Sequence, residues 1–339
     1  MKLLVTGGSG FIGRRLAQSL LARGTLAGAP IDRLVLVDQF PPDPALAADR
    51  RVESRTGPLL DQCPGFAADR FDGVFHLASA VSGECEDDFE LGLRSNLDTT
   101  RALLDALRAA TAAGAPPARV VFASSVAVFG PDPSSPLPAV VGDTTLPAPQ
   151  TSYGTHKLIC ESLIADYTRK GYIDGRAARL MTVTVRPGRP NGAASSFFSG
   201  IIREPLAGVE AICPVDPSTS HPLTSPARTV EGLIAVYEAS REHFGGRLAL
   251  NLPAVNARVS DMLDALEAVA GKAVRDRVRF VPDARVAGIV ANWPAGSSAE
   301  RAARLGLHAD ADFEAIIRQY IADCAATPEA LKGLPDGAR

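Results

Sequence analysis

The chain has 339 residues and a net charge of −3, so it is long enough for a large core in one or two domains, and it offers no basic field for nucleic acid. No apolar run is long enough to cross a membrane, and the chain opens directly on a strand rather than a signal peptide. The five cysteines (63, 85, 160, 213 and 324) are scattered, without metal-ligand spacing or a disulfide framework. We therefore expect reduced thiols in the cytoplasm and no metal.

The chain opens on a short apolar strand at residues 3–6 that runs into a glycine-rich turn and a predicted helix over 11–23. The first glycine, Gly7, permits a tight turn, Gly10 lets the backbone approach a pyrophosphate, and Gly13 allows the helix to pack closely on the strand. The helix amino terminus offers unpaired N–H groups and a partial positive charge to phosphates. This pattern predicts a dinucleotide site, with contacts from Gly7, Gly10, Phe11, Ile12 and Gly13.

The second strand, at 33–37, ends at Asp38. A carboxylate at that position accepts hydrogen bonds from the adenosine ribose hydroxyls and repels a 2′-phosphate. The cofactor is therefore expected to be NAD rather than NADP.

Strands and helices alternate through the first half of the chain, which predicts an α/β fold with a Rossmann-type, doubly wound parallel sheet. The expected strands are 3–6, 33–37, 73–77, 119–124 and 179–185, and the expected helices are 11–23, 86–112 and 152–170. Later segments read as helices at 197–205, 227–242, 261–270 and 312–324 and as a strand at 247–252. We expect an NAD-binding domain from 1–185 plus 226–255, and a smaller C-terminal substrate-binding subdomain from 186–225 plus 256–339.

A proline-rich stretch at 131–150 lies between the expected strand 119–124 and the helix that carries Tyr153 and Lys157. We interpret it as an active-site loop. The apolar strand before it ends at Ser124 and Ser125, and ligands of open parallel sheets sit at the carboxyl ends of the strands. Tyr153 and Lys157 are one helical turn apart on the same face.

These side chains form a coherent set for alcohol oxidation. The ammonium of Lys157 favours the phenolate of Tyr153 by charge attraction and can hold a nicotinamide ribose hydroxyl. Tyr153 then takes the hydroxyl proton as hydride leaves the carbon, while a serine hydroxyl orients the same oxygen.

The motifs occur in the order typical of one family. The segments Thr6-Gly-Gly-Ser-Gly-Phe-Ile-Gly13, His76-Leu-Ala-Ser79, Asn96, Ser124-Ser-Val-Ala-Val-Phe-Gly130 and Tyr153-x-x-x-Lys157 resemble the extended short-chain dehydrogenases/reductases. The resemblance implies that Ser125 is the catalytic serine, that Asn96 supports Lys157 through water, and that Leu77 and Ala78 line the cofactor. Where the family usually has Gly-Asp-Leu, this chain has Gly57-Pro-Leu59. Leu59 keeps its expected cofactor contact, but Pro58 offers no carboxylate to the adenine.

The substrate is indicated by the segment 185–206. Nucleotide-sugar epimerases of the family usually carry Arg-x-x-Asn-x-x-Gly-Pro here, whereas in this chain Asn191 is displaced and the Gly-Pro is absent. Together with His221-Pro-Leu-Thr-Ser225, the segment resembles a group that oxidises the C2 hydroxyl of D-erythronate, a four-carbon sugar acid, to 2-oxo-tetronate with NAD. The expected substrate contacts are Ser79, Ser125, Tyr153, Asn191, Ser195, Ser196, Arg203 and His221.

A carboxylate could bind the free N–H groups at the start of the short helix, near Ser195 and Ser196, with a bidentate contact from Arg203. Three alternatives stay open: a nucleotide-sugar 4-epimerase with tightly bound NAD, a dehydrogenase of another sugar acid or polyol, and an NAD-sensing protein without turnover. The resemblance and the apolar faces of helices 86–112 and 152–170 also predict a homodimer.

Overall fold

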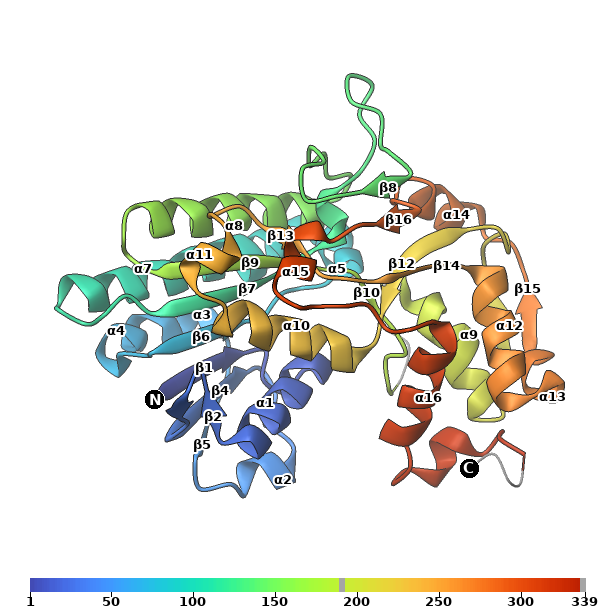
Figure 1. The fold of residues 1–339 in the computed structure, drawn as a ribbon, viewed down its shortest axis with the longest axis horizontal. Helices are drawn as coiled ribbons and strands as arrows, with labels where there is room; N and C mark the ends of the chain where they lie inside the picture. The colour runs from blue at the N-terminus through green and yellow to red at the C-terminus, as the bar shows by residue number, and fades with distance from the viewer. Residues whose placement is uncertain (189–192, 336–339) are drawn as a thin grey trace.

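A seven-stranded parallel sheet organises the first part of the computed structural model, which describes residues 1–188 and 193–335. Its strand order is β13-β9-β7-β6-β1-β4-β5, with β1 at the point where the direction of winding reverses (Figure 1). This is the doubly wound Rossmann-type arrangement that the alternating pattern predicts. The strands are β1 (Lys2–Thr6), β4 (Arg33–Asp38), β5 (Val52–Thr56), β6 (Gly73–His76), β7 (Arg119–Ser125), β9 (Asp174–Leu180) and β13 (Leu250–Asn251).

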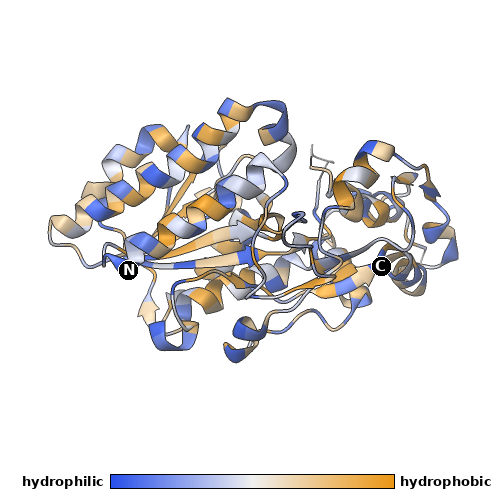
Figure 2. Cartoon of the chain, turned by 90° about the horizontal axis from the view of Figure 1, so that it is seen from above, coloured by the Kyte–Doolittle hydropathy of each residue, from blue (hydrophilic) through white to orange (hydrophobic). Residues whose placement is uncertain are grey.

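Helices cover both faces of this sheet, which explains why its central strands are apolar on both sides. Helices α1 (Phe11–Arg23) and α10 (Pro226–Glu238) pack on one face through residues such as Leu16 and Leu233. Helices α7 (Thr99–Ala112) and α8 (Ser152–Arg169) cover the other face. Seen from above, the strands between these helices are largely hydrophobic (Figure 2).

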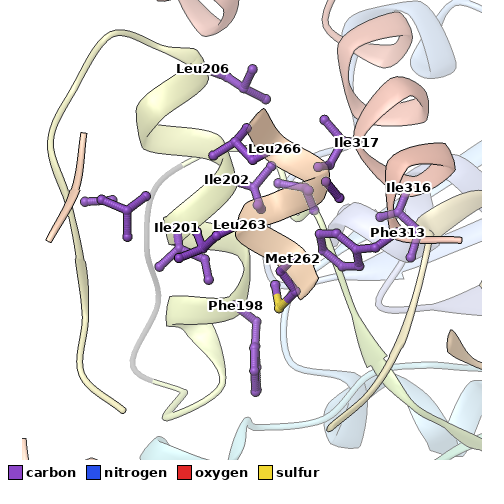
Figure 3. Packing of buried hydrophobic residues seen from close by; sticks show 14 of the residues in the cluster. Phe198, Ile201, Ile202, Leu206, Met262, Leu263, Leu266, Phe313, Ile316 and Ile317 are labelled. Atoms are coloured by element: carbon purple, nitrogen blue, oxygen red, sulfur yellow. The ribbon is translucent and has the colours of Figure 1, made fainter. Parts of the chain in front are cut away.

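A second lobe carries its own core. It contains β10 (Thr182–Val183), α9 (Ser196–Leu206), β11 (Ala211–Cys213), β12 (Ser220–Thr224), β14 (Val255–Arg258), α12 (Val259–Ala270), α13 (Lys272–Arg275), β15 (Val278–Phe280), α14 (Ala284–Val290) and α16 (Phe313–Asp323). Its core is formed by Phe198 and Ile202 of α9, Met262 and Leu266 of α12, and Ile317 of α16 (Figure 3). These apolar residues recur at helical spacing, so each helix buries one stripe against the others.

The proline-rich loop is fixed to the body of the molecule near its end. Its strand β8 (Val140–Val141) pairs in parallel with β16 (Gly296–Ser297). Asp143 then accepts hydrogen bonds from the backbone N–H groups of Asn251 at 2.8 Å and Arg301 at 3.0 Å. The segment around β16 and α15 (Glu300–Arg304) also packs on the main sheet, because Ala302 and Leu307 belong to the core under α1 and α10.

The remaining elements are short connectors: β2 (Thr25–Leu26), β3 (Ala29–Pro30), α2 (Pro44–Ala47), α3 (Leu59–Gln62), η1 (Cys63–Gly65), α4 (Phe66–Asp69), η3 (Val126–Val128), α11 (Arg241–Phe244) and η4 (Pro328–Leu331). Within the described ranges, no helix combines the length and the hydropathy needed to span a bilayer.

Two predicted elements differ from the structure. The single helix expected over 86–112 is divided into α5 (Ser82–Asp87), α6 (Phe89–Gly92), a π-helical turn η2 (Leu93–Asp98) and α7. The break occurs because Asp88 is extended and its carboxylate caps α6 at the N–H of Leu91. The strand expected over 179–185 begins earlier, at Asp174, and its last part is β10 in a separate small sheet.

Candidate active site

The glycine-rich turn leaves no room for side chains. Gly7 has a φ of +71°, and a Cβ on it would lie 2.9 Å from the backbone nitrogen of Ala78. A Cβ on Gly13 would lie 2.0 Å from the carbonyl oxygen of Gly7. Gly10 stands at the amino-terminal end of α1 with extended backbone, and no side chain caps the helix. The first N–H groups of α1, at Phe11 and Ile12, are therefore open to a phosphate group, as the sequence predicts.

Asp38 stands at the end of β4, next to this turn. Its carboxylate accepts the N–H of Ser9 at 3.0 Å and the N–H of Phe40 at 3.1 Å. These contacts fix the carboxylate at the carboxyl edge of the sheet, where a ribose of a dinucleotide would be held. Pro58 stands at the N-cap position of the short helix α3, and the next residue, Leu59, is buried. Leu59 can therefore line an adenine site, while Pro58 contributes no hydrogen-bonding side chain.

A buried chain of hydrogen bonds links the first strand to Asn96. Thr6 Oγ1 accepts the N–H groups of Leu77 and Ala78, both at 3.2 Å, so its own hydroxyl donates to His76 Nδ1 at 2.7 Å. The proton of His76 is then on Nε2, which donates to Thr100 Oγ1 at 2.9 Å. Burial lowers the pKa of His76 to about 3, so the ring stays neutral.

Asn96 lies in the π-helical turn and holds the loop after β6. Its Oδ1 accepts the N–H of Ala80 at 2.7 Å and the hydroxyl of Ser79 at 3.0 Å, and its Nδ2 donates to the carbonyl of Ala80 at 3.2 Å. Its backbone carbonyl accepts the hydroxyl of Thr100 at 2.5 Å. The side chain of Asn96 therefore positions the loop of Ser79 directly. The expected water-mediated support of Lys157 stays a prediction.

Ser125, Tyr153 and Lys157 come together at the carboxyl end of β7. Ser125 Oγ accepts the N–H of Ala127 at 3.1 Å, which fixes the rotamer of this side chain. Lys157 is buried, its Nζ donates to the carbonyl of Ala123 at 2.8 Å, and it lies 5.5 Å from the ring centroid of Tyr153. Thr151 caps α8 through the N–H of Gly154, so the Tyr153–Lys157 turn begins at a fixed place.

Burial dominates the charge states of this pair. Burial raises the pKa of Tyr153 to about 12, and the hydrogen bond with Ser125 opposes that rise. Burial lowers the pKa of Lys157 to about 8, while the nearby thiols and Glu161 act in the other direction. In the free protein, desolvation therefore favours the neutral form of both groups. An oxidised nicotinamide beside the pair would add a positive charge, and that charge would favour the phenolate of Tyr153.

Sequence reasoning missed a buried acid–base pair behind the catalytic residues. Glu161 Oε1 accepts the hydroxyl of Ser124 at 2.5 Å, and Glu161 forms a bidentate ion pair with Arg179 at 2.9 and 2.8 Å. Ser124 therefore points behind the site and Ser125 points into it. The signal was present in the sequence, since Glu161 follows Lys157 by four residues and so continues the same helical face.

The predicted substrate residues are placed unequally. Ser195 stands at the start of α9 without capping it through its side chain, and Ser196 is the first helical residue. The ring nitrogens of His221 are already engaged, by Thr182 Oγ1 at 2.7 Å and by the carbonyl of Pro294 at 3.2 Å, and burial lowers its pKa to about 4. His221 also stacks on Phe198, so its observed role is structural. Asn191 lies outside the described residues.

Arg203 does not reach an open site, in contrast to the expectation of a bidentate carboxylate contact. Its guanidinium is buried and donates to Glu204 Oε1 at 2.5 Å and to the carbonyl of Arg186 at 2.8 Å. The prediction placed Arg203 correctly on α9, but the adjacent Glu204 supplies its counter-charge. Its observed contacts hold α9 to the preceding loop.

The residues present fit a bound dinucleotide. The glycine-rich turn at Gly7 and Gly13 has no space for side chains, and no side chain caps the amino terminus of α1. Asp38 is held by the N–H of Ser9 at the end of the neighbouring strand. Gly7, Gly10, Phe11, Ile12, Gly13, Asp38, Leu59, Leu77 and Ala78 would hold the cofactor, with Asn96, Tyr153 and Lys157 around the nicotinamide end. When bound, NAD supplies the hydride acceptor.

Known proteins match this chain over most of its length. Residues 3–221 match the NAD dependent epimerase/dehydratase family. The chain is 49% identical to the D-erythronate dehydrogenase of Cupriavidus necator, covering 95% of this chain and 98% of the relative, and 38% identical to that of Haemophilus influenzae, covering 95% and 99%. A crystal structure described as a nucleoside-diphosphate-sugar epimerase from Agrobacterium tumefaciens superposes with a TM-score of 0.91 at 41% identity, covering 96% of this chain and 95% of that one.

The family match includes the positions of the glycine turn and of Ser125, Tyr153 and Lys157, and the two relatives match nearly the whole chain. The cofactor is NAD, and the chain is an NAD-dependent oxidoreductase. The chain belongs to the NAD dependent epimerase/dehydratase family, the extended short-chain dehydrogenases/reductases.

Proposed function

We propose that the chain oxidises D-erythronate at C2 to 2-oxo-tetronate, with one NADH released in each turnover. The observation that carries this proposal is the near-full-length similarity to two D-erythronate dehydrogenases. The assembled serine, tyrosine and lysine support the same reaction type, because alcohol oxidation needs a base and an oriented hydroxyl on the same oxygen.

Each residue has a defined part in the proposed reaction. Ser125 donates a hydrogen bond to the C2 oxygen, and the rotamer that Ala127 fixes suits this task. Tyr153 takes the C2 hydroxyl proton as the hydride leaves the same carbon. Lys157 holds a ribose hydroxyl of the cofactor and keeps a positive charge under the phenol, and the carbonyl of Ala123 orients its ammonium. Ser195 and Ser196, at the start of α9, are candidates for the remaining polar groups of the substrate.

The direct test measures NADH absorbance with a panel of four- to six-carbon sugar acids and with UDP-sugars. We expect the highest kcat/KM for D-erythronate and no interconversion of UDP-sugars. A higher kcat/KM for another sugar acid or for a polyol would correct the substrate and leave the reaction type in place.

A nucleotide-sugar 4-epimerase is the second candidate, because the similar crystal structure from Agrobacterium tumefaciens is described as that of a nucleoside-diphosphate-sugar epimerase. An epimerase retains its NADH and returns the hydride to the other face of a keto sugar. No NADH release with D-erythronate, together with interconversion of UDP-sugars without added cofactor, would establish the epimerase in place of the dehydrogenase.

The proposed assembly is a homodimer through α7 and α8, which lie next to each other on the outside of the sheet (Figure 1). Ile159 on α8 is 39% exposed, and Phe89 on α6, whose ring centroid lies 6.5 Å from that of His156 on α8, is 57% exposed, which supports an apolar contact there. Light scattering at micromolar concentration should give twice the chain mass, and a monomer mass would exclude the dimer. A cytoplasmic location is part of the same proposal, supported by five buried and unpaired cysteines.

A further inference from the structure

We propose that Glu161 is a positioning residue for the reaction. It holds the hydroxyl of Ser124, and it thereby fixes the adjacent Ser125 opposite Tyr153. This inference deepens the proposed function and rests on it, since it requires that Ser125 and Tyr153 act on the same substrate oxygen. Glu161 lies behind the active site, buried between α8 and the sheet.

Three consecutive turns of α8 face the end of β7. Tyr153, Lys157 and Glu161 are four residues apart from one to the next, so they lie along one side of the helix. The Nζ of Lys157 donates to the carbonyl of Ala123 at 2.8 Å. One turn later, Glu161 Oε1 accepts the hydroxyl of Ser124 at 2.5 Å. The helix is therefore tied to two consecutive residues of β7, immediately before the serine of the proposed reaction.

Glu161 also joins two neighbouring strands at one level of the sheet. Ser124 on β7 and Arg179 on β9 are partners in the parallel register. The Nε and Nη2 of Arg179 donate to the two carboxylate oxygens of Glu161 at 2.9 and 2.8 Å. All three residues are buried, so a single carboxylate connects one helix to two strands in the interior. The helix cannot slide along the sheet or turn about its axis without breaking one of these bonds.

The alternation of side chains along β7 explains how this constraint reaches the active site. Val120 and Phe122 belong to the core beneath α7 and α8, so Ser124, two residues further on, points toward the same helices. Ser125 follows at the end of the strand. The two serines are joined by a planar peptide unit, with their Cα atoms about 3.8 Å apart. A displacement of Ser124 therefore moves Ser125 with it.

Stability alone does not explain why a charged pair occupies this place. The cost of removing two charges from water can exceed their mutual attraction, and apolar residues of similar volume often stabilise a fold as well or better. Apolar contacts are non-directional, however, and would leave the position of α8 along the sheet less defined. The bond between Ser124 and Glu161 is directional and short, as hydroxyl–carboxylate bonds are. This arrangement suits positioning more than stabilisation.

The experiment separates an effect on rate from an effect on stability. S124A removes the bond to Glu161 and leaves its ion pair with Arg179 in place. The double variant E161L/R179M replaces the ion pair by apolar side chains and also removes the acceptor of the Ser124 hydroxyl. The matched control is T168A, because Thr168 Oγ1 accepts the N–H of Gly175 at 3.0 Å and so ties the far end of α8 to β9.

The variants should differ in which property they lose. With D-erythronate, S124A should lower kcat about 10- to 100-fold, since a misplacement of about 1 Å can cost about 10²-fold. Its Kd for NAD, measured by calorimetry, should stay near that of wild type. E161L/R179M should lose at least as much kcat and keep its stability in urea, and adding S124A to it should have no further effect. T168A should lose stability and keep the kcat of wild type.

Three results would overturn the assignment. The first is a wild-type kcat in S124A. The second is a full effect of S124A in the E161L/R179M background, because Ser124 would then act without Glu161. The third is an equal loss of kcat in T168A, which would indicate a general loosening of α8. If E161L/R179M does not fold, E161Q replaces it. The side-chain carbonyl of E161Q still accepts the Ser124 hydroxyl, so this variant should keep a higher kcat than S124A although it loses the ion pair, and the reverse order would contradict the assignment.

A titration without substrate separates this assignment from the proposed function. Tyrosinate formation with rising pH is followed by ultraviolet difference absorbance in the enzyme–NAD complex, and subtraction of the Y153F signal isolates Tyr153. The hydrogen bond with Ser125 favours the phenolate, so S124A should titrate at higher pH than wild type, and T168A should not. This result supports the assignment even if wild type does not oxidise D-erythronate, which would overturn only the proposed function. An unchanged titration in S124A would overturn the assignment.

Discussion

The two edges of the active cleft are built by different means. The cofactor edge is made of backbone: Gly7 and Gly13 have no space for a Cβ, and the open N–H groups of α1 face the place of the phosphates. At the other edge, where we propose that the substrate binds, side chains of α9 meet the loop before it: Ser199 accepts the N–H of Arg186, and Arg203 donates to the carbonyl of Arg186. A backbone site demands particular residues at fixed spacing, whereas a side-chain site depends on which charges neutralise one another.

The comparison explains why the sequence is more informative about one edge than about the other. A glycine that must accommodate a close approach is visible in a strand–turn–helix pattern. The sequence also shows where an arginine lies, but it does not show whether a carboxylate already pairs with its guanidinium. The position of Arg203 on a helix suggests that its guanidinium is free to bind a ligand. In the structure the guanidinium instead forms an ion pair with its direct neighbour, Glu204.

The largest expected effect is on the chemistry that both edges serve. Tyr153→Phe should lower kcat by about 10²- to 10⁴-fold, because it removes the proton acceptor and leaves the cofactor edge intact. The Kd for NAD should change little, since the phenol hydroxyl is one of many contacts. Stopped-flow NADH formation measures the first effect and calorimetry the second. Near-normal turnover of this variant would show that another group takes the proton.

The buried ion pairs of the two regions can be compared directly. Glu161→Gln should lower the free energy of unfolding by about 3–5 kcal/mol, because it leaves the guanidinium of Arg179 buried without a counter-ion. Glu204→Gln should cost less, since the side chain of Glu204 is 21% exposed and that of Glu161 is 7% exposed. Urea unfolding of both variants gives the difference. Equal losses would mean that burial does not distinguish the two pairs.

A steric test addresses the cofactor edge alone. Gly13→Ala should cost about 1–3 kcal/mol of stability, as overpacking does, and should weaken NAD binding, since the new Cβ would lie 2.0 Å from Gly7 O. Gly65→Ala is the control, because a Cβ there has nothing within 4 Å and the backbone φ of −75° suits any residue. Thermal unfolding with and without NAD would detect both effects. A Gly13→Ala protein with wild-type affinity for NAD would contradict the close packing of the turn.

The buried lysine should make stability depend on pH. Since burial lowers the pKa of Lys157 from 10.5 to about 8, its charge destabilises the folded state fully below pH 8, and the penalty fades as pH rises toward 10.5. Lys157→Met should therefore be about 1–2 kcal/mol more stable than wild type at neutral pH, after the lost bond to the Ala123 carbonyl is counted. The advantage should shrink above pH 8. Urea unfolding across this range measures it, and a gain that is constant with pH would exclude titration of Lys157 as its cause.

The smallest expected effect concerns the choice of cofactor. Asp38→Asn keeps the shape of the side chain but removes the charge that repels a 2′-phosphate. The ratio of kcat/KM for NAD over NADP should fall by about tenfold, equivalent to about 1.4 kcal/mol. An unchanged ratio would mean that another residue discriminates between NAD and NADP.

The fold could be predicted well where strands are apolar and poorly where they carry charge. Strands β1, β4, β6 and β7 were recognisable from their buried apolar runs. Strand β9 was missed in its first half because it contains Arg176, which is fully buried. Its guanidinium binds the carbonyls of Val236, Tyr237 and Ala239 at the end of α10, so an internal partner satisfies a residue that reads as exposed.

In the candidate site, the catalytic residues could be predicted from the sequence, whereas the pairing of its buried charges could not. The positions of Ser125, Tyr153 and Lys157 followed from order and spacing, and the structure brings them together. The pair of Glu161 with Arg179 joins a helix to a strand, and no local pattern contains it. Glu204 lies next to Arg203 in the sequence, but adjacency alone does not show that the two side chains form an ion pair. The pKa of Tyr153 likewise follows from burial, which a sequence alone does not provide.

The hydrogen-bond chain through His76 has a spectroscopic consequence. Because every hydroxyl from Thr6 to Thr100 has one possible direction, the imidazole has a single tautomer, with its proton on Nε2. That proton is buried and should exchange slowly with solvent, so it should give one sharp downfield NMR resonance in an ¹⁵N-histidine-labelled sample. The His76 ring lies between the first strand, which leads into the glycine turn, and the π-helical turn that contains Asn96. The chemical shift of this N–H proton should therefore change when the cofactor binds, and no substitution is needed to observe it.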